Sequence, residues 1–143
     1  MFDTLYSQIG LVPMVLVGIL AFTKGDEAER LAMGGYLLGW MASLLLQDDG
    51  AVQANWQPGL FALDVATTLM FGAIAWKYRL SWPIWAAALQ LIVVMGHIVI
   101  LFDQRPGMTA FYTVMNLASY GILLAIAIGA FWAWQERRAA GLE

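Results

Sequence analysis

Five long apolar stretches, separated by short polar segments, set the pattern of this chain. A helix needs about 20 apolar residues to cross roughly 30 Å of hydrocarbon, because it rises about 1.5 Å per residue. Each stretch is close to that length, so the pattern predicts an all-α, polytopic membrane protein built as a bundle of five transmembrane helices. Their expected bounds are about 6–23, 28–46, 58–76, 82–102 and 109–134.

Residues typical of helix ends mark several of these boundaries. Asp26 and Glu29 have the three-residue spacing of a capping box before the second helix. Pro58 suits the first turn of the third helix, because the fixed φ of proline is compatible with a helix start. The polar segment 47–57 and the Arg-Pro-Gly run at 105–107 predict solvated turns between helices.

Basic residues divide unevenly between the two sides of the predicted bundle. Lysine and arginine are retained on the cytoplasmic side of short loops, so the asymmetry predicts an outside N-terminus and a cytoplasmic C-terminus. Only Arg105 falls on the outer side. The basic residues expected on the cytoplasmic side are Lys24, Arg30, Lys77, Arg79, Arg137 and Arg138.

Tryptophans gather near the cytoplasmic ends of the last three predicted helices. Indole rings favour the headgroup level, where an apolar body and a polar N–H are both accommodated. We interpret these residues as an interfacial belt, with an aromatic substrate cage as the alternative. They are Trp76, Trp82, Trp85, Trp132 and Trp134.

Composition supports the membrane interpretation and excludes several other classes of protein. The 143 residues are 62% hydrophobic and 12% charged, which is about half the charge of a soluble domain. We expect one transmembrane domain over 1–143, no soluble domain, and a location in the bacterial inner membrane. The absence of cysteine excludes disulfides and thiolate chemistry. The basic residues form no patch, so nucleic acid is not an expected partner.

Small residues recur at four-residue spacing in two of the predicted helices. Helices in lipid associate through close backbone approach at such positions. We therefore expect two closely packed faces, against each other or against a partner protein. The residues are Gly35, Gly39 and Ser43 in the second helix, and Gly121, Ala125 and Gly129 in the fifth.

Polar residues inside the apolar stretches indicate a candidate site. Asp64 is the only acid well inside a predicted span, and His97 is the only histidine. The third and fourth helices are antiparallel, so both residues are expected at similar depth, roughly 9 Å below the outer end. Asn116 in the fifth helix falls at about the same depth. Three helices thus contribute polar groups to one layer.

Four further residues share faces with this layer by helical spacing. Thr68 follows Asp64 by one turn, and Gln90 precedes His97 by two turns, while Tyr112 and Tyr120 flank Asn116 in the fifth helix. Two interpretations are open. The layer is either a hydrogen-bonded structural network or a proton or small-solute site open to the outer side, because desolvated Asp and His can both change protonation near neutral pH.

Metal and enzyme chemistry find no support in the sequence. One histidine and one carboxylate supply two ligands, whereas zinc usually takes three or four protein ligands. No Gly-x-Ser-x-Gly or His-Glu-x-x-His motif appears, so we do not expect an enzyme. No cofactor is required, although a single histidine, His97, could ligate a chlorophyll-type pigment or a haem.

Three functions follow from these observations as hypotheses. The first is a small accessory or assembly subunit of a larger membrane protein complex, or a homo-oligomer. The second is a proton-coupled or small-solute transport module that uses the polar layer. The third is tetrapyrrole binding through His97. The expected partners are the lipid bilayer and either other membrane protein subunits or a second copy of this chain.

Overall fold

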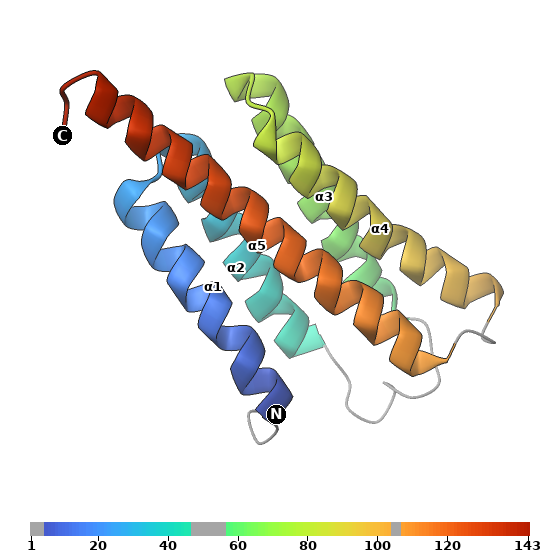
Figure 1. Ribbon diagram of the computed structural model, residues 1–143. Helices are drawn as coiled ribbons and strands as arrows, with labels where there is room; N and C mark the ends of the chain where they lie inside the picture. Colours follow the sequence, from blue (N-terminus) through green and yellow to red (C-terminus); the bar gives the residue numbers. More distant parts are fainter. Residues whose placement is uncertain (1–4, 47–56, 104–106) are drawn as a thin grey trace.

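The computed structural model describes residues 5–46, 57–103 and 107–143 (Figure 1). These residues form helices and no strand, which confirms the all-helical prediction. Residues 47–56, Arg105 and Pro106 of the predicted turns lie outside the described residues. The helices are α1 (Leu5–Lys24), α2 (Glu27–Leu46), α3 (Pro58–Tyr78), α4 (Trp82–Phe102) and α5 (Met108–Ala139).

The five helices lie side by side with alternating direction (Figure 1). One end of the bundle carries the α1–α2 turn, the α3–α4 turn and the C-terminus, whereas α1 begins at the other end. The α1–α2 and α3–α4 connections enforce this arrangement within each pair, because a chain that turns within two or three residues must place the next helix antiparallel to the last. We call the end with the two turns the basic end, since Lys24, Lys77, Arg79, Arg137 and Arg138 lie there.

Three local features fix the turns at the basic end. The Oε2 atom of Glu29 accepts a hydrogen bond of 2.8 Å from the backbone N–H of Asp26, as in one half of the expected capping box. Arg79 ends α3 in the left-handed region, with φ 57°, and its N–H donates to the Ala75 carbonyl. Pro83 lies in the first turn of α4, as its fixed φ favours.

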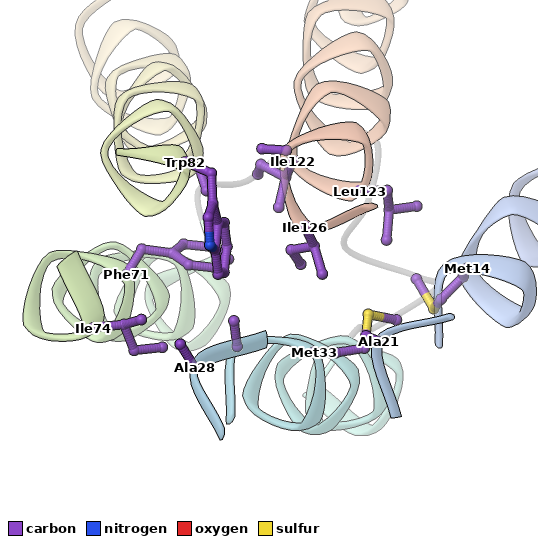
Figure 2. Packing of buried hydrophobic residues seen from close by; sticks show 13 residues of the cluster. Met14, Ala21, Ala28, Met33, Phe71, Ile74, Trp82, Ile122, Leu123 and Ile126 are labelled. Atoms are coloured by element: carbon purple, nitrogen blue, oxygen red, sulfur yellow. The ribbon is translucent and has the colours of Figure 1, made fainter. Parts of the chain in front are cut away.

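The core fills the centre of the bundle with side chains from all five helices (Figure 2). Phe71, Ile122 and Ile126 are fully buried there, and Trp82 points into the same space. Trp82 is only 4% exposed, so its expected place in the interfacial belt is wrong. The reason is its N–H, which reaches a buried acceptor inside the bundle instead of water. The other described tryptophans of the belt are more exposed, and Trp76 is 74% exposed.

Among the residues that the structure describes, three helices are long and apolar enough to cross a membrane: α3, α4, and α5 from Thr109. Large apolar side chains also cover the outside of the bundle, which fits an integral membrane protein because lipid tails are their favourable surroundings. The described part of α1 from Ile9 is apolar but shorter. The first turn of α2 contains Glu27, Glu29 and Arg30, which lower the mean hydropathy of that helix.

The small-residue face of α2 packs on α3. A Cβ atom added at Gly35 would overlap the Met70 side chain, and one at Gly39 would lie 3.5 Å from Oγ1 of Thr67. Ser43 donates its hydroxyl to the Trp40 carbonyl within α2, at 2.6 Å. The close approach expected here therefore occurs inside the chain, against α3.

The small-residue face of α5 packs on α4. A Cβ at Gly121 would lie 2.7 Å from Leu89, and one at Gly129 would lie 2.5 Å from Nε1 of Trp82. Ala125, between the two glycines, is 7% exposed. Both small-residue faces thus contact helices of the same chain, and the indole of Trp82 requires the space that Gly129 leaves.

Candidate functional site

The α3–α4 hairpin brings together a carboxylate, an amide and an imidazole. Asp64 lies in the second turn of α3, and Gln90 and His97 lie two turns apart on one face of α4. Nε2 of Gln90 donates to Oδ1 of Asp64 at 2.7 Å, and Nε2 of His97 lies 2.8 Å from Oδ2. We call these three residues the Asp64 cluster. Antiparallel packing of α3 on α4 is what places them at one depth.

The Asp64 cluster is buried but not sealed. Gln90 is 4% and His97 is 6% exposed, whereas the side chain of Asp64 is 22% exposed. Both carboxylate oxygens have a partner, and hydrogen bonds of this kind are stronger in a low-dielectric interior than in water. The hydrogen bonds of the cluster are therefore satisfied internally, and its carboxylate stays partly exposed.

The contact between Asp64 and His97 allows more than one protonation state. A protonated imidazole donates to the carboxylate as an ion pair. A neutral imidazole either donates to the carboxylate or accepts the proton of a carboxylic acid at the same distance. The amide of Gln90 is neutral and can donate to Oδ1 of Asp64 in each of these protonation states. The geometry thus accommodates the gain or loss of a proton without a new partner.

Two phenylalanines frame the imidazole of His97. The ring of Phe61 lies 6.1 Å away and that of Phe111 lies 5.6 Å away, each edge-on at 77°. A Cβ added at Gly96 would lie 3.1 Å from Phe111, so this glycine lets α5 approach. Sequence reasoning missed both rings. The sequence contained a signal for Phe61 only. This residue comes three positions before Asp64, a spacing that puts both side chains on one face of α3.

Two further polar residues, one from α3 and one from α2, lie near the cluster without entering it. The Thr68 hydroxyl donates to the backbone carbonyl of Asp64 at 2.8 Å, so it contacts the main chain of that residue. Tyr36 of α2, which sequence reasoning missed, lies near Ser119 of α5 and within electrostatic range of Asp64. Four helices therefore contribute polar groups to this depth of the bundle.

The remaining candidates lie on another face of α5. Asn116 is exposed, and Tyr112 and Tyr120 are 39% and 41% exposed. The hydroxyl of Tyr120 faces Gly10 of α1. In the described contacts none of the three bonds to the Asp64 cluster. Asn116 comes five residues after Phe111, a rotation of about 140° around the helix. Its predicted depth is similar to that of His97, but it therefore lies on a different face of α5 from the one that contacts His97.

A second buried carboxylate lies near the basic end, and sequence reasoning treated it only as a helix cap. Glu29 is 2% exposed, and its Oε1 accepts a 2.9 Å hydrogen bond from Nε1 of Trp82. Its Oε2 accepts the N–H of Asp26. We call Glu29, Trp82 and this N–H the Glu29 cluster. It joins α2 to α4 through a contact between residues that are 53 positions apart, which no local pattern reveals.

Neither a metal nor a tetrapyrrole gains support from this geometry. The described residues contain no group of three or more His, Cys, Asp or Glu side chains that could hold a metal ion. Nε2 of His97 is engaged by Asp64, and the ring is framed by Phe61 and Phe111. A pigment or haem ligated through Nε2 would have to displace the carboxylate. The absorption spectrum of the purified protein tests that hypothesis directly.

Comparison of the chain with models of known families, with curated proteins and with solved structures finds no match. The chemistry of the Asp64 cluster therefore has to be argued from its own residues and contacts.

Proposed function

We propose that all five helices cross a membrane, with the N-terminus outside and the C-terminus in the cytoplasm of a bacterium. Two features support this topology. The helices alternate in direction, and the basic residues of α1, α3 and α5 lie at the end that also carries the C-terminus. A reporter that fluoresces only in the cytoplasm should be active when fused after Glu143. If the C-terminal fusion is inactive and an N-terminal fusion is active, the protein has the opposite orientation.

We propose that the protein handles protons in the outer half of the membrane, as a proton-coupled or small-solute transport module. The observation that carries this proposal is the 2.8 Å contact between Asp64 and His97, within a buried cluster whose carboxylate is partly exposed. Ionisable residues are costly inside a membrane, and those that occur there commonly belong to proton or solute pathways. In the proposed topology, the cluster exchanges protons with the outer side.

The number of helices constrains how such a module can work. Alternating access usually depends on two structural repeats that move against each other around a central site. Five helices do not divide into two such repeats, so we propose that complete transport requires two copies of the chain. A single copy would supply one proton site and its access from outside.

The test is proton flux into liposomes after a step in external pH. Asp64→Asn and His97→Ala should each slow proton uptake about tenfold or more, because the first removes the carboxyl group and the second removes the imidazole that contacts it. Glu29→Gln is the matched control, since it neutralises the other buried carboxylate and should leave flux unchanged. Equal flux in all four proteins, with each variant folded, would exclude the proposal.

An accessory or assembly subunit is the second candidate, favoured by how little of the described chain lies outside helices. Outside α1 to α5, the described residues are only short turns and a C-terminal segment of four residues, 140–143. Recognition of a partner would then occur mainly within the bilayer. A partner that co-purifies in mild detergent, together with unchanged flux in Asp64→Asn, would favour this role over proton handling.

A further inference from the structure

A groove opens on the bundle surface where α3 turns into α4. Its volume is about 570 Å³, and its apolar lining includes Gly72 from α3 and Ile84 and Ala87 from α4. Arg79 and Ser81, in the turn itself, line the end of the groove nearest the basic end. The groove lies nearer the basic end than the Asp64 cluster does, although Ala87 of its lining is only one helical turn before Gln90.

The charge at the end of this groove is positive. The guanidinium of Arg79 lies 4.7 Å from the ring centroid of Trp76, which also lines the groove. Lys24, Lys77 and Arg137 each pair with a carboxylate, but within the described part of the chain no carboxylate forms an ion pair with Arg79. Its charge therefore remains available to a ligand.

The position of the groove identifies the kind of ligand. Its apolar part faces outward from helices that are apolar enough to cross a membrane, and its charged part lies beside exposed Trp76 and Trp85, at the end where headgroups are expected. A ligand that matches both parts has a negative headgroup joined to an apolar chain. Basic pockets between transmembrane helices on the cytoplasmic side bind such headgroups.

We propose that this groove binds an anionic phospholipid, with its phosphate on Arg79 and the upper part of one acyl chain along Gly72, Ile84 and Ala87. The hydroxyl of Ser81 provides a second polar group at the same end of the groove. The proposal requires only that α3 and α4 cross the membrane, and it does not depend on proton handling by Asp64.

Native mass spectrometry of the purified protein tests this site, with phosphatidylglycerol and phosphatidylcholine of equal chain length as the probes. The wild-type protein should retain phosphatidylglycerol in preference to phosphatidylcholine. Arg79→Gln should weaken phosphatidylglycerol retention about fivefold, the effect of one basic residue at an anionic membrane surface. Gly72→Leu should weaken it with the charge unchanged, because a Cβ at Gly72 meets no atom within 4 Å, so the leucine side chain has room to occupy the groove.

Arg138→Gln is the matched control. Arg138 is also an arginine beside a tryptophan, 5.3 Å from the Trp134 ring, at the same end of the bundle but outside the groove. Its replacement should leave phosphatidylglycerol retention unchanged. If Arg79→Gln and Arg138→Gln lose phosphatidylglycerol retention equally, the lipid is attracted by positive charge in general and the proposed site is wrong. Unchanged retention in Arg79→Gln would also overturn the site. Thermal unfolding of each variant verifies that it is folded.

Discussion

Asp64, which is partly buried, and Glu29, which is fully buried, are carboxylates toward opposite ends of one bundle, and their partners differ in kind. Glu29 accepts from an indole N–H and a backbone N–H, groups that do not titrate near neutral pH. Asp64 contacts His97, the residue type that titrates most readily near neutrality. The Glu29 cluster therefore contains one ionisable side chain, whereas the Asp64 cluster contains two that share a contact.

The exposure of the two carboxylates also differs. Glu29 is sealed by the core, at 2% exposure, while the side chain of Asp64 is 22% exposed. A sealed carboxylate with fixed donors joins helices, because moving either helix would leave a buried acceptor without a partner. A carboxylate with a titratable partner and an open side is suited to proton exchange. Partner type and access, more than the carboxylate itself, distinguish the two clusters.

Removal of Trp82 should have the largest effect, because it breaks the Glu29 cluster and leaves a cavity in the core. We expect Trp82→Ala to lower the free energy of unfolding by about 3–5 kcal/mol. Trp85→Ala is the control, since Trp85 is 70% exposed and its replacement should cost about 0.5 kcal/mol or less. Denaturant unfolding in detergent micelles measures both. Similar losses for the two tryptophans would contradict the core position of Trp82.

A methyl group at Gly129 should perturb the same cluster from the α5 side. It would overlap the Trp82 indole, so we expect Gly129→Ala to destabilise the protein by about 1–3 kcal/mol. Gly72→Ala is the matched control in a helix, because its Cβ would meet open space and alanine favours helices. If Gly129→Ala proves as stable as Gly72→Ala, the Glu29 cluster tolerates movement of α5 and does not hold the bundle in one arrangement.

The sequence predicted the helices well because their lengths follow from apolar runs. The exception is the end of α5, where the polar residues after Trp134 suggested termination, yet the helix continues to Ala139. This polar extension has partners: Arg137 bonds to the Asp26 carboxylate in the α1–α2 turn and lies 3.7 Å from Glu143. Such contacts depend on the folded arrangement, and a local hydropathy pattern does not contain them.

The candidate site was predictable only as far as depth and helical spacing determine it. The structure brings Asp64, Gln90 and His97 together for two reasons. The α3–α4 hairpin places Asp64 at the depth of its two partners, and Gln90 and His97 share one face of α4. The rotation of α5 about its axis is set by packing on α4 through Gly121 and Gly129, so depth did not determine which α5 residues face His97. The contact of Glu29 with Trp82 was likewise hidden by its long separation in sequence.

The smallest expected effect tests how far the Asp64 cluster extends. Asn116 is exposed and has no described bond to the cluster, so Asn116→Ala should change the free energy of unfolding by about 0.5 kcal/mol or less and leave proton flux at the wild-type rate. Liposome flux beside Asp64→Asn makes the comparison. A flux as low as that of Asp64→Asn would mean that α5 rotates during function and brings Asn116 to the carboxylate. The proton site would then belong to three helices that move, and its difference from the fixed Glu29 cluster would be one of motion as well as chemistry.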